Sequence, residues 1–265
     1  MKVIFSLIYP LVLFSTSLCA SEEMAKADSL FELRDRELDT ERLIADTTAI
    51  DQAIVGYKNI LEKSLNRDEK EEALWKLLQA FYYKGQFGTD DKKQKKEIYS
   101  RGIKIGETYE QEFPESVEVN TWLGILWARW AEVYGIFAAA RKGVAKKIKY
   151  YGEKAVELDD RYLDAGGYRL LGMLHFSVPK IPLLLTWPSK DLALEYLEKA
   201  YEIAPQNLYN KMYLTEVLYS ANQKERAKTL LLEIIDTKSL VHDRAIDLFI
   251  KKQAQEFLDR HYRSN

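Results

Sequence analysis

Aromatic side chains gather in one short segment, where their spacing predicts a shared helical face. Trp127, Trp130, Tyr134 and Phe137 follow one another at intervals of three or four residues, and Trp122 precedes them slightly off this line. Residues three and four apart are neighbours on a helix surface. These rings could line an apolar cleft or pore that takes an apolar ligand or a partner segment. The alternative is core packing between helices, where large aromatics are commonly buried.

An arginine that follows two glycines is the second candidate binding group. Arg169 comes after Gly166, Gly167 and Tyr168. A guanidinium holds a carboxylate through paired hydrogen bonds, which predicts a site for an organic acid at Tyr168 and Arg169. The alternative is structural: Arg169 caps or pairs with a neighbouring acid such as Asp164, while the glycines turn the chain into a helix.

An apolar stretch between two expected helices is the third candidate. Residues 181–187 read Ile-Pro-Leu-Leu-Leu-Thr-Trp and include Leu184 and Trp187. Loops normally face water. This one either folds back over the helices and joins the core, or it docks onto a partner or lines a channel as an exposed apolar patch would.

Residue patterns typical of catalysis are weak throughout. His175, His242 and His261 have no metal-ligand spacing, and the chain has neither a phosphate-binding glycine loop nor a nucleophile elbow. Helical lytic transglycosylases use a Glu-Ser pair, but Glu115 and Ser116 fit a helix start better, with Ser116 as the N-cap. We therefore expect a protein that is not an enzyme, with no catalytic residue, metal or cofactor.

The composition indicates long helices with few interruptions. The 265 residues include only 12 Gly and 6 Pro, and 47% are hydrophobic, which argues against a turn-rich β-protein and against disorder. With 39 basic and 41 acidic residues, the chain lacks the basic footprint of nucleic-acid binding.

Residues 1–20 have the pattern of a signal peptide. A single lysine precedes an apolar run, followed by small and polar residues, and this run is shorter than a membrane helix requires. The only cysteine, Cys19, lies at its end. Either Cys19 is acylated as the first residue of a lipoprotein, or it is removed with the signal. Both alternatives place the protein in the periplasm, with a lipid anchor in the first.

The remaining chain, residues 21–265, is predicted to form one domain of repeated helical hairpins. Leu208–Ser220 and Lys224–Asp236 have apolar residues at helical spacing, follow Pro205, and fit the 34-residue tetratricopeptide template. Weaker copies precede them, with insertions around Tyr134–Val144 and Ser177–Lys190. The predicted fold is all-α: a tetratricopeptide-repeat-like, right-handed helical solenoid with inserted loops and a C-terminal capping helix over Ser239–Tyr262.

One segment carries a family resemblance. Residues 162–172 (Tyr-Leu-Asp-Ala-Gly-Gly-Tyr-Arg-Leu-Leu-Gly), the proline-containing loop that follows, and the Trp122–Glu132 segment resemble the T-component (TatT) family of tripartite ATP-independent periplasmic (TRAP) transporters. The resemblance covers roughly residues 45 to 240. One departure lies in this loop, which has Thr186–Ser189 where a glycine-rich turn would be expected.

The resemblance implies a non-enzymatic periplasmic accessory component of a solute-uptake system. Such a protein binds a TRAP periplasmic substrate-binding protein, assembles as a homotrimer around a pore, and takes a hydrophobic or organic-acid small molecule. The alternative function is a general tetratricopeptide scaffold for protein–protein interaction in cell-envelope assembly, which predicts a different partner and no small-molecule site.

Overall fold

The computed structural model describes residues 22–180, 186–238 and 241–262. The expected signal peptide with Cys19, and Leu184 of the apolar loop, lie outside these residues. No helix within the described ranges is long and apolar enough to cross a membrane.

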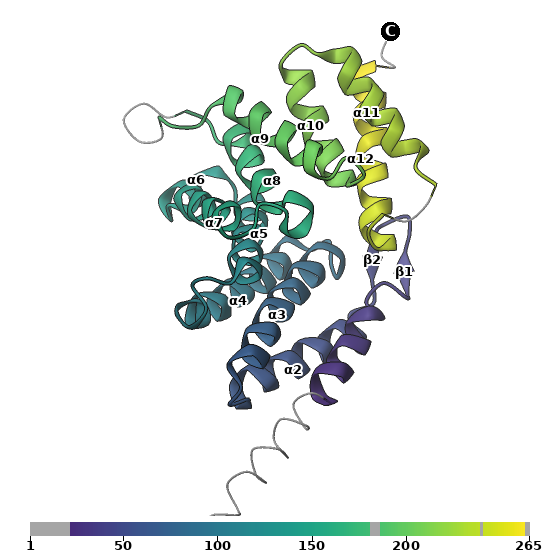
Figure 1. The fold of residues 1–265 in the computed structure, drawn as a ribbon. Coiled ribbons are helices and arrows are strands. Elements are labelled where there is room, and N and C mark those ends of the chain that lie inside the picture. Colours follow the sequence, from purple (N-terminus) through teal and green to yellow (C-terminus); the bar gives the residue numbers. More distant parts are fainter. Residues whose placement is uncertain (1–21, 181–185, 239–240, 263–265) are drawn as a thin grey trace, which may run out of the picture.

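The chain forms a series of helices arranged one after another, with a two-stranded hairpin near the start (Figure 1). An N-terminal helix covers residues 22–32. The elements that follow are β1 (Leu38–Asp39), β2 (Ile44–Ala45), α2 (Thr48–Lys63), α3 (Arg67–Phe87), α4 (Lys92–Tyr109), the short 3-10 helix η1 (Glu110–Glu112), α5 (Val117–Tyr134), α6 (Ile136–Arg141), α7 (Val144–Leu158), α8 (Tyr162–Ser177), α9 (Lys190–Ile203), α10 (Leu208–Ser220), α11 (Lys224–Asp236) and α12 (Arg244–Tyr262).

Neighbouring helices pack as hairpins, which confirms the predicted all-α solenoid. The closest pairs include α2 with α3, α5 with α7, α8 with α9, and α10 with α11. The bounds of α10 and α11 are those predicted from the tetratricopeptide spacing. The small residues of the pattern allow the close approach: a Cβ on Gly172 would lie 2.5 Å from Leu197 Cγ on the next helix.

The aromatic segment does not continue as one helix to Phe137, as its spacing had suggested. Gly135 has φ +88°, a conformation that glycine adopts readily, and it ends α5 at Tyr134. The predicted insertion around Tyr134–Val144 contains the short helix α6. The expected helix start at Ser116 is confirmed, because Ser116 Oγ accepts a hydrogen bond from Val119 N at 3.3 Å.

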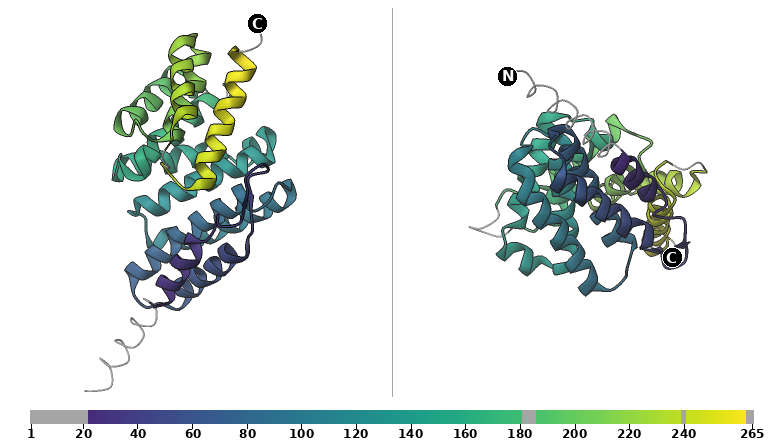
Figure 2. Two further views of the ribbon diagram at one scale, coloured as in Figure 1. Left: turned by 90° about the vertical axis from the view of Figure 1, so that its right-hand side faces the viewer. Right: turned by 90° about the horizontal axis from the view of Figure 1, so that it is seen from below.

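The last helix caps the array and also reaches its beginning. α12 packs on α10 and α11, and its first turn joins the core of the N-terminal half through Ala245. The Phe249 ring lies 5.9 Å from that of Phe87 at the end of α3, and Lys252 Nζ donates to Glu41 O at 3.0 Å. In Figure 2 the yellow α12 runs from the last hairpin back to the purple N-terminal elements. α12 therefore links the last hairpin to the N-terminal elements.

Candidate functional site

A cavity of about 750 Å³ lies between α3, α5, α8, α10 and the residues just before α12. We call it the central cavity. Ligand pockets in proteins typically have volumes of ~300–1,000 Å³. Residues of α6, α7 and α12 itself also line it, so the cavity depends on the whole array rather than on one hairpin.

One side of the central cavity is apolar. The side chains of Ile125, Ala128, Leu170, Met173 and Leu174, from α5 and α8, face it. Trp122 from the predicted aromatic stripe also lies there, and its Nε1 donates to the Tyr162 hydroxyl at 3.2 Å. This wall suits apolar side chains of a ligand.

Polar and aromatic side chains also line the cavity. The hydroxyls of Tyr82 and Tyr209 are 2.8 Å apart. Arg129 donates from Nη1 to Glu132 Oε2 at 2.8 Å and from Nη2 to the Tyr213 hydroxyl at 2.9 Å. This network holds α3, α5 and α10 together along one edge of the cavity.

Glu216 lines the cavity without a partner. Among the residues that the structure describes, it has no hydrogen bond and no ion pair. Burial, with a smaller contribution from the nearby Glu132 carboxylate, raises the pKa of Glu216 to about 7, although Arg129 opposes this shift. Glu216 is therefore a cavity carboxyl that changes charge near neutral pH.

α8 begins with a left-handed turn at the cavity wall. Leu163, Asp164 and Ala165 have φ values of 51°, 54° and 65°. For residues other than glycine this conformation costs roughly 1–2 kcal/mol each. Our expectation that Gly166 and Gly167 turn the chain is wrong, because the three residues before them do so.

Arg169 stabilises this turn. Its Nη1 donates to Asn210 Oδ1 at 2.7 Å and to Asp164 O at 3.2 Å, and its Nη2 donates to Leu163 O at 3.1 Å. Arg169 lines the central cavity, but these bonds correspond to the structural alternative for this residue, in which it caps neighbouring groups. Its partner Asn210 is fully buried and also donates from Nδ2 to Asp164 O at 3.0 Å.

Several residues of this site are absent from the predictions made on the sequence. Asn207 and Asn210 are two of them, although an asparagine just before a helix is a readable N-cap signal. Tyr209, Tyr213 and Glu216 were missed as well. Their spacing of four and three residues places them on one face of α10, and that periodicity could have identified them.

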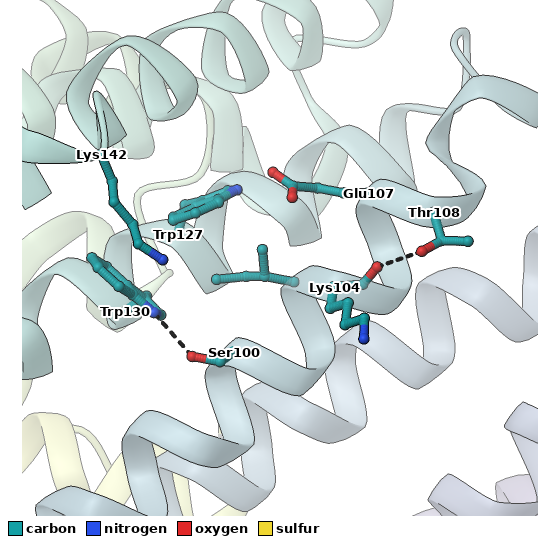
Figure 3. A pocket seen from close by; sticks show the side chains of 8 residues that line it. Ser100, Lys104, Glu107, Thr108, Trp127, Trp130 and Lys142 are labelled. Carbon is teal, nitrogen blue, oxygen red and sulfur yellow. Dashed lines mark hydrogen bonds between the residues drawn. The ribbon is translucent and has the colours of Figure 1, made fainter.

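Two aromatic residues of the predicted stripe, Trp127 and Trp130, line a different hollow, which we call the tryptophan cleft. It has a volume of about 340 Å³ and lies between α4 and α5 (Figure 3). Trp127 and Trp130 lie there beside Lys142, and Trp130 Nε1 donates to Ser100 Oγ at 3.1 Å. Tyr134 stacks on Trp130 with a centroid distance of 3.8 Å. Trp127 and Trp130 are only 5% and 2% exposed, so these rings contribute mainly to packing.

Two further predicted residues lie away from both hollows. Tyr168 is half-buried, with its ring 6.1 Å from that of Tyr196. Trp187 is half-buried against His175, at a centroid distance of 5.2 Å. His175 Nδ1 accepts from Ser189 N, and burial lowers its pKa. In the described part of the chain, no group of three His, Cys, Asp or Glu residues could hold a metal ion.

The fold places the chain in a class: all-α helical-repeat proteins of the tetratricopeptide type. The crystal structure of TTC0263, a thermophilic TPR protein of Thermus thermophilus, is similar with a TM-score of 0.59 at 14% identity, covering 90% of this chain and 98% of that one. Two crystal structures of MamA are similar at lower TM-scores, 0.44 and 0.47. Their sequence identities are 16% and 15%. The first alignment covers 78% of this chain and 91% of the MamA chain, and the second covers 92% and 95%. The MamA likenesses carry no weight here.

The family follows from the sequence. A family model described as regulator of microtubule dynamics protein 1-3 matches residues 40–262, and the chain belongs to this family. No curated protein matches the sequence of this chain. The TRAP transporter resemblance is thus supported only at the level of a tetratricopeptide-like fold.

Proposed function

We propose that the chain is a non-enzymatic scaffold for protein–protein interaction, and that its central cavity holds a segment of a partner protein. The observation that carries this proposal is the cavity of about 750 Å³ bounded by α3, α5, α8, α10 and the start of α12. Tetratricopeptide-like solenoids present extended inner surfaces that bind in this way.

The walls of the cavity fit a peptide segment. The apolar wall at Leu170 and Met173 offers area to apolar side chains, and the polar side at Arg129 and Tyr213 offers hydrogen-bonding groups. A peptide combines these two surfaces, since its side chains are apolar at some positions and polar at others. Affinity comes from burial of the apolar groups, and orientation comes from the polar ones.

Photo-cross-linking tests the scaffold. A photoreactive amino acid at Met173, which lines the cavity, should capture one partner peptide, whereas the same group at the exposed Leu232 on α11 should not. The Ala128→Trp variant fills the cavity and should prevent capture, and Leu232→Trp is the matched control. Equal capture at Leu232, or capture that persists in the filled variant, would contradict the proposal.

A narrower candidate is the accessory component of a TRAP solute-uptake system. The observation that favours it is that the segment carrying the resemblance, residues 162–172, supplies Leu163, Asp164 and Arg169 to the cavity wall. This candidate includes export to the periplasm by residues 1–20, lipid attachment at Cys19, a homotrimer, and an organic-acid or hydrophobic solute. We favour the general scaffold, because the matching family model is a different one.

Co-purification from the native membrane fraction separates the two candidates. The narrower one requires a solute-binding protein in the complex and a neighbouring permease gene, and it requires fatty-acid labelling that the Cys19→Ala variant loses. A complex without a solute-binding protein would exclude the TRAP candidate, and the general scaffold would remain.

A further inference from the structure

The charged groups of the central cavity are mostly paired with each other or with nearby residues. Four carboxylates and two guanidiniums line it: Glu132, Asp164, Glu216, Asp243, Arg129 and Arg169. Glu132 pairs with Arg129, Asp164 Oδ2 accepts from Asn207 Nδ2 at 2.9 Å, and Asp243 pairs with Arg34. Within the described part of the chain, Glu216 is the carboxyl of this set that has no such bond.

Both guanidiniums have protein partners. Arg169 bonds two main-chain carbonyls and Asn210, and both terminal nitrogens of Arg129 donate to Glu132 and Tyr213. The Nε of Arg129 has no hydrogen-bond partner among the described residues, but its charge is already balanced by Glu132. Of the carboxylates that the structure describes in the cavity, that of Glu216 is the one without a protein partner that balances its charge.

Aromatic rings and apolar side chains surround the same space. Tyr213 lies three residues before Glu216 on α10, and its ring is 5.7 Å from that of Tyr209. Phenol rings attract cations over their faces. The apolar wall at Ala128 and Met173 lies in the same cavity and suits the methylene stem of a long basic side chain.

We propose that Glu216 is the counter-ion for a lysine side chain of the bound partner segment, with the lysine stem against the apolar wall and the ammonium group at the Glu216 carboxylate. This inference rests on the proposed scaffold function and names the chemistry that its cavity recognises. Glu216 is half-buried and has no partner for its charge among the described residues, so an arriving ammonium gains a charge-assisted interaction there.

The proposal predicts a pH dependence of binding. Because the pKa of Glu216 is about 7 in the unoccupied cavity, an ammonium must compete with a proton below this pH. Other titratable and charged groups around the cavity also affect the pH dependence of cation binding. They are Tyr82 on α3, Arg129 and Glu132 on α5, Asp164 and Arg169 on α8, Tyr209 and Tyr213 on α10, and His242 and Asp243 before α12. From pH 8 to pH 5.5 the affinity for a cation should fall by about thirtyfold, as linkage to one group of this pKa requires.

Simple amphiphiles test the charge preference on the purified full chain. The probes are n-octylammonium, which imitates the lysine stem and head, together with octanoate and 1-octanol, measured by titration calorimetry. At pH 8 octylammonium should bind at least about tenfold more tightly than 1-octanol, a factor expected for one charge-assisted interaction. Glu216→Gln should reduce octylammonium to the level of octanol and leave octanol binding unchanged.

The control is Glu256→Gln, which removes an exposed carboxylate on α12 and should alter nothing. Octanoate binding as tightly as octylammonium, a preference that survives Glu216→Gln, or binding that does not weaken at pH 5.5 would overturn the proposal. If cross-linking at Met173 succeeds while octylammonium has no advantage, only the lysine assignment fails. If octylammonium has its advantage and no partner is captured, the scaffold function fails instead.

Discussion

Arg34 and Asp243 form an ion pair across 209 positions of the chain, with 2.9 Å between Nη2 and Oδ2. Both side chains are largely buried, at 12% and 15% exposed. Asp243 also accepts from Ile246 N at 2.8 Å through Oδ1, so it caps the start of α12. One carboxylate thus fixes the last helix to the residues that follow the first helix, at the edge of the central cavity.

Loss of this carboxylate should destabilise the fold measurably. Asp243→Ala removes a helix cap and leaves the largely buried Arg34 with only the exposed Glu32, 3.7 Å away, as an ion-pair partner. Together these losses should lower the free energy of unfolding by roughly 2–4 kcal/mol. Urea denaturation followed by circular dichroism measures this change. The exposed pair Arg42–Asp90 is the control, and its removal should stay within experimental error. Similar losses for the two pairs would contradict the structural role of Asp243.

Replacement of Arg169 by lysine distinguishes the two roles considered for this residue. A single ammonium cannot reach Leu163 O, Asp164 O and Asn210 Oδ1 together, so Arg169→Lys should lower the free energy of unfolding by about 2–4 kcal/mol. Equilibrium urea unfolding provides the measurement. A variant that keeps its stability but loses binding of an organic acid would show instead that Arg169 is a ligand receptor.

Glu216 should make the stability depend on pH in the direction opposite to that of a salt-bridged carboxylate. Its folded-state pKa is raised from 4.5 to about 7, so the folded protein keeps a proton that the unfolded chain releases. Stability therefore falls as pH rises from 4.5 to 7, by at most about 3 kcal/mol from this group, and levels off above.

The Glu216→Gln variant isolates this contribution. It should be more stable than the unmodified chain at pH 8, and the difference should shrink toward pH 4.5. Urea titrations at pH 4.5, 6 and 8 measure both trends, with Glu256→Gln as the exposed control. A difference that is constant across these pH values would show that the carboxyl ionises as it does in water.

Substitutions that change side-chain volume test the close contact of α8 and α9. A Cβ on Gly172 would meet Leu197 Cγ at 2.5 Å, so Gly172→Ala should cost about 1–3 kcal/mol through overpacking. In the double variant with Leu197→Val, part of this loss should be regained, because the smaller side chain leaves space. Thermal unfolding of the two single variants and the double variant measures the coupling. Simple addition of the two losses would argue against this contact.

The repeats could be predicted from the sequence because local spacing determines them. α10 and α11 have apolar residues at helical intervals, and Pro205 ends the helix before them, so their bounds follow from the pattern. Trp122, Arg169 and Tyr168 were candidates because of their residue types and local sequence context, and only Trp122 and Arg169 line the central cavity.

Other features depend on contacts between distant parts of the chain. The left-handed turn at Leu163–Ala165 has no sequence signal, since none of its residues favours that conformation strongly. It persists because Arg169 and Asn210 hold its carbonyls, and Asn210 is 46 positions from Asp164. Similarly, the raised pKa of Glu216 depends on burial between helices and on Glu132 of α5. The periodicity of a single helix cannot reveal such contacts.

The contacts of α12 change how the molecule can deform. In an open solenoid each repeat contacts only its neighbours. Small shifts between repeats can therefore change the curvature of the array, and it can unfold one repeat at a time from either end. Here Phe249 lies against Phe87, and Lys252 donates to Glu41, so the final helix joins the two ends. Fraying at either end must break contacts with the other end, and the domain should therefore unfold as one cooperative unit with its curvature fixed.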